Sequence, residues 1–449
     1  MTTKYDVIIV GGGPAGIFAA LELSQLPHLR ILLIEKGKDI DERTNLVCGL
    51  GGAGAYSDGK LTLTPEVGGH LQEYLSPTEA WALIKYVDCI YLKFGAPDRI
   101  YGVGDEVDRI SRQASLAGLR LTPVPLRHLG TEHCRLILRA MRDHLISRLE
   151  LKLETSAVTV VTNKGKVMGI ETGTGERFSC DYLILAPGRE GADWLANEAK
   201  RLKMTLYNNP VDVGIRVEVP SAVMAELTSV LYEAKLEYLS KSFDDRIRTF
   251  CMCPAGEVTM ETTGGNDPVI TVNGHSYANS KSQNTNFALL VSTDFTEPFR
   301  EPIAYGKYLA RLANILSGGV LIQRLGDLME GHRSTPSRIE RGIVKPTLPE
   351  ATPGDLSFVL PYRHLTGLLE MIQALDRLAP GVAAKHTLLY GVEVKFYSCR
   401  PHLSSGLETE IENMFAAGDG AGVSRGLIQA SASGIVAARE ILKRTSKGA

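Results

Sequence analysis

The chain has 449 residues, of which 44% are hydrophobic, and its 49 Lys and Arg against 51 Asp and Glu leave a formal net charge of −2. A chain of this length exceeds one compact core and indicates two domains, or one domain with large insertions. The balanced charge argues against a general nucleic-acid binder or a polybasic membrane-surface protein, and the hydrophobic content excludes a disordered chain.

The termini and the cysteines indicate where the protein works. No apolar run is long enough to span a bilayer, and the N-terminus leads directly into a strand without the features of a signal peptide. The seven cysteines are odd in number and scattered, as in a protein whose thiols stay reduced. We therefore expect a cytoplasmic α/β protein that neither binds nucleic acid nor inserts stably into a membrane.

The first motif is a nucleotide-binding fingerprint. An apolar strand at 6–10 ends in GGGPAG, in which Gly11, Gly13 and Gly16 satisfy G-x-G-x-x-G. A helix at 17–26, a second strand at 30–34 and the acid Glu35 follow in the order that this fingerprint requires. The first glycine allows the tight turn, the second lets a pyrophosphate approach the backbone, and the third lets helix and strand pack closely.

A second match to the same pattern, at 49–54, does not predict a second nucleotide site. The residues before it, 41–45, are too polar for a buried strand, and 56–60 do not open a helix. This loop, which includes Gly52 and Ala53, suits close backbone approach to a flat ligand. A dedicated NAD(P)H domain would need its own fingerprint, so NAD(P)H would visit only transiently, if it is used at all.

Two later segments repeat the arrangement of a buried strand followed by glycine. Residues 181–189 form an apolar strand stopped by Pro187 and Gly188, and residues 413–422 end in Gly418 and Asp419. A helix with many small residues follows at 426–442.

With these segments the chain resembles the two-domain FAD flavoprotein superfamily that includes glutathione reductase and fumarate reductase. The resemblance covers 1–65, 128–200 and 396–449. Four stretches are similar to a widespread family of FAD-dependent dehydrogenases. They are GGAGAYSDGKL at 51–61, CPAGEV at 253–258, GDGAG at 418–422 and RG at 425–426.

The resemblance implies a non-covalent FAD and assigns roles in holding it. The pyrophosphate would lie against Gly11, Gly13, Pro14, Ala15 and Gly16, and Glu35 would accept from the adenosine ribose. Val158 would present its backbone to the adenine, and Ala186 and Gly188 would let the chain pass close to the nucleotide. Asp419, beside Gly418, would hold a ribityl hydroxyl or the pyrophosphate region. Gly426, Gln429 and Ala430 would begin the helix that points at the flavin ring.

Two departures narrow the class of enzyme. Ala186-Pro187-Gly188 replaces the Asp-Gly strand motif of aromatic hydroxylases, and no proline stands in the C-terminal Gly-Asp segment, which argues against a monooxygenase. The absence of C-x-x-C or C-x-x-x-x-C from the sequence argues against a disulfide reductase.

We expect a Rossmann-like FAD-binding domain that is discontinuous in sequence, with an inserted α+β substrate domain. Three separate segments, at 1–65, 128–200 and 396–449, are expected to build the FAD-binding domain. A helical insertion is expected at 66–127, and a substrate domain with a mixed or antiparallel sheet at 201–395. Residues 274–286 are interpreted as a polar loop.

Candidate catalytic residues are few, because the flavin supplies the hydride chemistry. Cys253, with Cys251 on the same face of a strand, is a candidate, although both also fit as small apolar residues. The backbone separation of two such positions in a strand is expected to strain a direct disulfide between them. Lys60 would place a positive charge near the flavin, or would be a solvated surface lysine. Tyr277 and His275 would exchange a substrate proton, or would have no role in a surface loop. Arg400 would bind a substrate carboxylate, or pair with an acid. The histidine spacing predicts no metal.

The sequence thus predicts an FAD-dependent dehydrogenase or reductase that transfers hydride between flavin and a small molecule. Three alternatives remain: a flavin-dependent monooxygenase or oxidase, a prenyl-chain reductase, and a flavin-stabilised binding protein that does not turn over. The substrate, the direction of the reaction, the electron donor or acceptor and the oligomeric state are left open.

Overall fold

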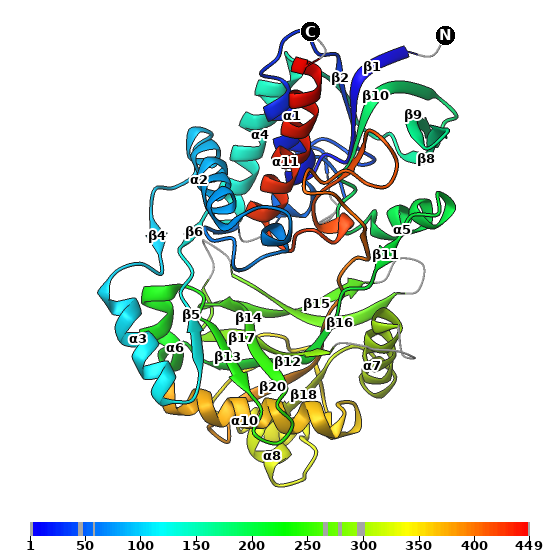
Figure 1. Cartoon of the computed structure of the whole chain (residues 1–449). Helices are drawn as coiled ribbons and strands as arrows, with labels where there is room; N and C mark the ends of the chain where they lie inside the picture. Colours follow the sequence, from blue (N-terminus) through cyan, green and yellow to red (C-terminus); the bar gives the residue numbers. More distant parts are fainter. Residues whose placement is uncertain are drawn as a thin grey trace. The chain divides into compact units, whose positions relative to one another are not determined.

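The computed structural model describes residues 3–43, 48–56, 59–263, 268–276, 281–293 and 301–447. The chain divides into two compact units. Unit 1 consists of Met1–Arg99, Arg127–Asn209 and Ser398–Ala449, and unit 2 of Ile100–Leu126 and Pro210–Tyr397. Unit 1 is thus assembled from the start, the middle and the end of the chain, as its blue, green and red ribbons show (Figure 1).

Unit 1 is built on a mainly parallel sheet. Its strands follow the order β7-β2-β1-β10-β9-β8, and β22 also pairs with β10. Strands β7, β2, β1, β10 and β22 are parallel neighbours, whereas β9 and β8 form an antiparallel extension. Their bounds are β1 Thr3–Val10, β2 Ile31–Ile34, β7 Glu150–Lys152, β8 Ala157–Asn163, β9 Lys166–Thr172, β10 Arg177–Leu185 and β22 Met414–Ala416. This confirms the Rossmann-like sheet expected from the apolar runs.

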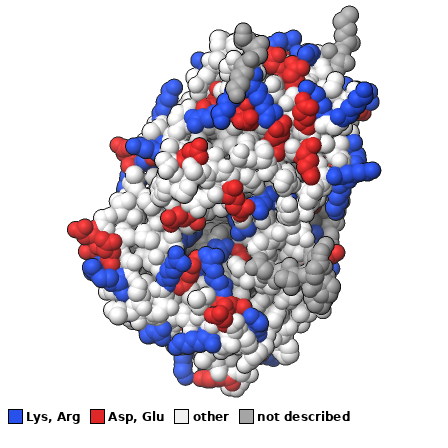
Figure 2. Space-filling view, in the orientation of Figure 1, with Lys and Arg blue, Asp and Glu red and all other residues white. Residues whose placement is uncertain are grey.

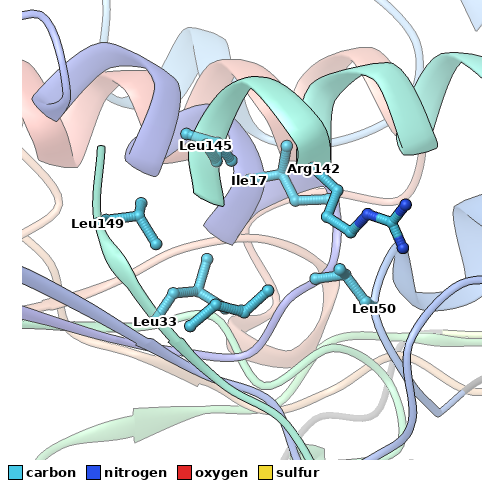
Figure 3. A pocket seen from close by; sticks show the side chains of 7 residues that line it. Ile17, Leu33, Leu50, Arg142, Leu145 and Leu149 are labelled. Atoms are coloured by element: carbon cyan, nitrogen blue, oxygen red, sulfur yellow. The ribbon is translucent and has the colours of Figure 1, made fainter. Parts of the chain in front are cut away.

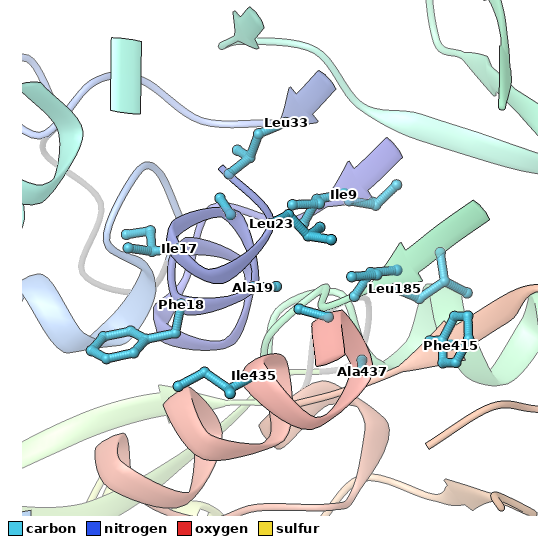
Figure 4. Close-up of a cluster of buried hydrophobic side chains, with 14 of the residues drawn as sticks. Ile9, Ile17, Phe18, Ala19, Leu23, Leu33, Leu185, Phe415, Ile435 and Ala437 are labelled. Carbon is cyan, nitrogen blue, oxygen red and sulfur yellow. The ribbon is translucent and has the colours of Figure 1, made fainter. Parts of the chain in front are cut away.

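Helices cover this sheet and build its core. They are α1 (Pro14–Leu23), α2 (Pro77–Lys93), α4 (Thr131–Ile146), α5 (Ala192–Arg201) and α11 (Leu427–Lys447). Figure 4 shows Phe18 of α1 and Ile435 of α11 in the same cluster as Ile9 and Leu185 of the sheet. Burying each such side chain contributes roughly 1.5–3 kcal/mol, so the first and last helices of the chain stabilise one core.

Unit 2 contains an eight-stranded sheet of order β19-β18-β20-β12-β17-β14-β13-β5. Its pairs are antiparallel, except that β18 and β19 run parallel. The strands are β5 Arg120–Thr122, β12 Val211–Pro220, β13 Lys235–Leu239, β14 Arg246–Cys253, β17 Asn284–Thr293, β18 Leu321–Arg324, β19 Thr352–Pro353 and β20 Leu388–Lys395. An antiparallel ribbon of β15 (Glu257–Thr263) and β16 (Val269–His275) also belongs to this unit. The mixed sheet expected for a substrate domain is therefore present.

One face of the large sheet packs against helices. These helices are α3 (Asp105–Leu116), α6 (Ser221–Leu231), α7 (Pro302–Ser317) and α10 (Tyr362–Leu378), and the short α8 (Leu325–Met329) and α9 (Pro336–Glu340) follow β18. Strand β12 shows how the two faces differ. Val213, Ile215 and Val217 lie in the apolar core of this unit, whereas the intervening Arg216 and Glu218 are also fully buried.

Most expected helices and strands agree with the structure within a few residues, but the polar loop at 274–286 is wrong at both ends. Gly274 and His275 belong to β16, where they pair with Val258 and Glu257, and β17 already begins at Asn284. Backbone pairing in the ladder outweighed the polar composition that had suggested a loop.

The segment expected as a helical insertion, 66–127, is shared by both units: α2 lies in unit 1 and α3 in unit 2. The remaining short strands are β3 Lys60–Thr62, β4 Ile100–Tyr101, β6 Leu126–His128, β11 Leu206–Tyr207 and β21 Arg400–Pro401. The five-segment division of the chain stays a prediction. Within the described ranges, no helix has the length and apolar character needed to cross a membrane.

Candidate functional site

The first glycine-rich loop joins β1 to α1 at the carboxyl end of the parallel sheet. Gly11 has a φ of 104°, and a Cβ there would lie 2.0 Å from the Ala186 carbonyl oxygen. A Cβ at Gly16 would lie 1.9 Å from the carbonyl oxygen of Gly11. Only glycine fits at these two positions, because one closes the turn against β10 and the other brings the helix onto the strand.

The start of α1 is open to an anion. Pro14 occupies the first turn, and the capping residue Gly13 supplies no side-chain hydrogen bond to the helix. The nearest atom to a Cβ placed on Gly13 is the Cα of Gly52, 3.8 Å away. The N–H groups of Ala15 and Gly16 in this first turn, together with the helix dipole, suit a phosphate.

Glu35 follows β2, as the fingerprint predicts, and it fixes both glycine-rich loops. Its Oε2 accepts from the N–H of Gly12 at 2.8 Å. Its Oε1 accepts from the N–H groups of Gly37 and Gly49 at 2.9 and 3.0 Å. The carboxylate is 7% exposed, so the two loops hold it in one orientation beside the end of the sheet.

The second glycine-rich loop packs directly on the first. The N–H of Gly51 donates to the Gly12 carbonyl at 2.8 Å, and residues Gly52–Tyr56, which include Ala53, form a short 3-10 helix. The buried Arg43 donates from Nη1 to the carbonyls of Leu50 and Gly52, each at 2.8 Å. Sequence reasoning missed this arginine, because nothing in the polar stretch 41–45 indicates that its side chain is buried.

The C-terminal glycine turn lies in the same unit. The N–H of Gly418 donates to Ser433 Oγ at 2.9 Å, which ties the turn to α11. Asp419 accepts from Ser424 Oγ at 2.6 Å, and Arg189 donates to its other carboxylate oxygen at 3.3 Å. Arg189 follows Gly188 in the turn after β10, so the structure connects two segments that the sequence placed at the nucleotide separately.

Gln429 lies in the first turn of α11, as expected, and its side chain has a further local role. Its Nε2 donates to the carbonyls of Pro65 and Val67 at 3.0 and 2.9 Å, and its Oε1 accepts from the N–H of Leu71 at 3.2 Å. The side chain therefore fastens the 65–71 segment to the first turn of α11, which Gly426 and Ala430 close through a backbone hydrogen bond of 2.9 Å.

Val158 lies in β8 at a register shift between Ala157 and Thr159. Its carbonyl accepts from Trp194 Nε1 at 2.8 Å, and the residue is 47% exposed. The tryptophan uses the carbonyl, so the N–H is the backbone group that Val158 would offer to an adenine.

A cluster of charged side chains forms next to the 65–71 segment. Glu73 accepts from Arg400 Nη1 at 2.6 Å and pairs with His70 Nδ1 at 2.7 Å. Arg425 Nη2 lies 3.3 Å from His70 Nε2. Because arginine only donates, Nε2 accepts and the proton resides on Nδ1. Burial, and then the charge of Arg425, lower the pKa of His70.

This cluster joins residues more than 300 positions apart, and no sequence signal connects them. Arg400 pairs with an acid, as one of its two interpretations expected.

The three candidate catalytic residues lie in different regions of the chain. Lys60 begins β3 in unit 1 and is half-buried. Cys253 ends β14 in unit 2 and is completely buried. Tyr277 lies outside the described residues.

A small pocket among the described residues of unit 1 lies beside the second glycine-rich loop, whose Leu50 is part of its lining. Figure 3 shows the side chains that line it, which are apolar apart from Arg142. The guanidinium of Arg142 pairs with Asp39 at 2.8 Å. The volume of the pocket is about 10 Å³, room for no more than a single water. On the face seen in Figure 2, basic and acidic side chains are interspersed.

Family comparisons agree with this arrangement. A model of an FAD binding domain matches residues 6–85, which contain both glycine-rich loops and Glu35. A model described as the C-terminal domain of FAD-dependent proteins matches 210–396, nearly the whole of the larger segment of unit 2. The chain is an FAD-dependent protein that carries both of these domains.

Other likenesses of this flavoprotein are more distant. A model of glucose inhibited division protein A matches residues 348–448. The structure of glycine oxidase from Bacillus cereus is 15% identical to this chain with a TM-score of 0.40, and the match covers 98% of this chain and 95% of the glycine oxidase chain. L-proline dehydrogenase from P. horikoshii is 11% identical with a TM-score of 0.45, covering 99% and 95%. The substrates of these proteins are not carried over to this chain. No curated protein matches the flavoprotein in sequence.

The residues present fit FAD. The open helix start at Gly13 leaves room for a pyrophosphate, and Glu35 lies at the end of the neighbouring strand. FAD supplies hydride transfer when it is bound. The chain's own residues provide a helix dipole, a buried carboxylate and a packed loop around that position.

Proposed function

We propose that this flavoprotein is a dehydrogenase or reductase that transfers hydride between non-covalently bound FAD and a small-molecule substrate. The observation that carries the proposal is the pair of interlocked glycine-rich loops, held together by Glu35 and Arg43 at the start of α1. This arrangement leaves one face of Gly13 open, and its positive helix end suits a pyrophosphate.

The residue roles follow from position. Gly11, Gly13, Pro14, Ala15 and Gly16 would line the pyrophosphate, with Gly52 and Ala53 on the facing loop, and Glu35 would accept from the ribose. Val158 would bind the adenine through its N–H, and Ala186 and Gly188 would allow close passage of the chain. Asp419, beside Gly418, would hold a ribityl hydroxyl, and Gly426, Gln429 and Ala430 would direct the start of α11 at the ring. Lys60, Cys253 and Tyr277 stay candidates for positioning charge or protons.

The decisive experiment is an anaerobic titration of the purified protein followed by visible absorption. We expect flavin bands as isolated, and release of the flavin into the supernatant when the protein is denatured, because the binding is non-covalent. Bleaching by NADPH or NADH would identify a nicotinamide-driven reductase, and bleaching only by its own substrate a dehydrogenase. Absence of flavin bands, even after FAD is added, would refute the proposal.

A pair of variants tests the proposed nucleotide contact. Asp419→Ala removes a carboxylate proposed to touch FAD. A hydrogen bond to a charged group contributes about 1.5–3 kcal/mol, so its loss should weaken FAD binding roughly ten- to hundredfold. Glu408→Ala is the matched control. Its carboxylate pairs with Arg444 at 2.7 Å in the same unit and has no proposed contact with FAD, so FAD affinity should stay unchanged.

A further inference from the structure

Strand β14 is distorted where it carries Cys251 and Cys253. Phe250 lies opposite Ala288 and Cys253 lies opposite Asn286, so three steps along β14 span two along β17. Cys251 lies in this bulge with a φ of 44°. In a regular strand, backbone positions two residues apart are separated by roughly 6.5 Å, but here the two Sγ atoms are 4.0 Å apart.

The two thiols differ in access. Cys253 is completely buried, and its Sγ lies 3.5 Å from the carbonyl oxygen of Cys251. Cys251 is partly exposed. A reagent from solution therefore reaches Cys251 first, and Cys253 lies behind it.

A buried cation sits against the pair. Arg216, which is 0% exposed, donates from Nη1 to the Cys251 carbonyl at 3.1 Å and to Asn286 Oδ1 at 2.7 Å. The guanidinium is also paired with the buried carboxylate of Glu393 at 2.8 Å, and it interacts electrostatically with both sulfur atoms. A nearby positive charge stabilises a thiolate relative to a thiol, and the thiolate is the nucleophile in disulfide exchange.

A second feature of the cluster is a buried donor that the protein does not use. Arg216 can only donate, so it fixes Asn286 with Oδ1 toward the guanidinium and Nδ2 away from it. Asn286 is 0% exposed, and among the described residues its Nδ2 has no hydrogen-bond partner. This amide occupies the position opposite Cys253, where it can donate to negative charge that develops in the cluster.

We propose that Cys251 and Cys253 form a reversible dithiol–disulfide couple, a two-electron centre of this protein in addition to FAD. The co-reactant is a small-molecule disulfide such as oxidised glutathione. The couple does not depend on which substrate reacts at FAD.

The exchange proceeds in two balanced steps. The Cys251 thiolate attacks one sulfur of the small disulfide, whose S–S bond breaks; a mixed disulfide forms, and the first small thiol leaves with the proton of Cys251. Cys253 then attacks Sγ of Cys251, which forms the internal disulfide and releases the second small thiol with the proton of Cys253. The protein loses two electrons, which reduce the small disulfide to two thiols.

The remaining cysteines provide internal controls. Burial raises the pKa of Cys180 to about 12, so this thiol should not react in the folded protein. Cys89 is exposed on α2 and should react with any oxidant that is present.

The sequence allows a direct test by peptide mapping. Trypsin cleaves after Arg248 and Lys281, and the peptide 249–281 contains Cys251 and Cys253 and no other cysteine. The full-length holoprotein is incubated with oxidised glutathione under native conditions, then quenched with N-ethylmaleimide in denaturant, so that buried thiols are also labelled, and digested. We expect peptide 249–281 to become lighter by two hydrogen atoms and to carry no maleimide, and dithiothreitol should reverse this change. Two maleimides on that peptide, under conditions that glutathionylate Cys89, would overturn the proposal.

Two single variants test the order of attack. In Cys253→Ser, Cys251 should accumulate as a mixed disulfide with glutathione, because the resolving thiol is absent. In Cys251→Ser, Cys253 should stay unmodified, because it is buried. Modification of Cys253 but not of Cys251 would contradict the assigned roles. Should either variant fail to fold, the wild-type peptide map alone decides whether the couple exists.

Discussion

The ion pair between Arg216 and Glu393 gives the sharpest prediction for unit 2. Arg216 donates from Nε to Glu393 Oε2 at 2.8 Å and from Nη2 to Oε1 at 2.9 Å, and both side chains are 0% exposed. Burial alone would raise the pKa of Glu393, but the charge of Arg216 outweighs it and holds that pKa below its ordinary value. The carboxylate is therefore charged, and its removal leaves a buried cation.

Glu393→Gln is the appropriate perturbation, because it keeps the shape and removes the charge. Breaking a buried ion pair by changing one partner costs about 3–5 kcal/mol. Lys395 Nζ lies 3.1 Å from Glu393 Oε1, so the variant also leaves two cations near one another. We therefore expect a loss toward the upper end of that range. Arg216→Met with Glu393→Met removes both charges and should restore some of the stability.

Hydrogen exchange of backbone amides in β12 and β20 measures this loss within unit 2. Each 1.4 kcal/mol corresponds to a tenfold change in equilibrium constant, so exchange should accelerate by about a thousandfold or more. Glu330→Gln is the matched control, since Lys385 and Glu330 lie 3.0 Å apart within unit 2 with side chains 79% and 50% exposed. An exposed pair contributes about 0–1 kcal/mol. An effect of Glu393→Gln as small as that of this control would refute the reasoning.

The remaining predictions concern unit 1. Gly11→Ala should abolish FAD retention, because its Cβ would lie 2.0 Å from a carbonyl oxygen. Retention is measured as the ratio of flavin to protein absorbance. The control Gly173→Ala should retain FAD, because its Cβ would lie 3.7 Å from the nearest atom. Glu35→Gln presents an amide to three N–H donors and should cost about 1–3 kcal/mol in urea unfolding; an unchanged midpoint would contradict this. His70 has a lowered pKa in the folded protein, so the unfolded state binds more protons near that pKa. The free energy of unfolding should therefore fall as the pH drops below about 6.5, and it should fall less steeply in His70→Gln. Equal slopes of unfolding free energy against pH in the two proteins would contradict the assignment.

Local patterns were sufficient to predict the nucleotide-binding region of unit 1. Gly11, Gly16 and Glu35 have positions set by a strand, a turn and a strand that are contiguous in sequence, so spacing alone predicted where they lie. Arg43 was missed because its partners are backbone carbonyls of a loop, and carbonyls leave no mark in a sequence.

Gln429 illustrates a different limit. Its position at the start of α11 was expected, but its three hydrogen bonds go to the 65–71 segment, more than 350 residues earlier in the chain. The cluster of His70, Glu73 and Arg400 depends on the same long-range meeting. Such contacts follow from the order of strands in the sheet, which periodicity within a single segment does not specify.

Strand β12 shows why alternation can mislead about exposure. Its sequence VDVGIRVEV alternates as a strand with one face in solvent would, yet all nine of these residues are buried. Charged residues are buried there because each has a specific partner: Arg216 has Glu393, Asp212 has Arg248 and Tyr397, and Glu218 accepts from Tyr390.

These partners also determine the register of the sheet. A slip of β12 by one residue would exchange its two faces, moving valines to the polar side and separating each buried charge from its counter-charge. Purely apolar strands tolerate a shifted register more readily, because an apolar side chain packs against any apolar neighbour. A bidentate ion pair, in contrast, requires one geometry. The buried polar face of unit 2 thus favours a single pairing of β12 with β17 and β20, the pairing that places Asn286 beside Arg216 and opposite Cys253.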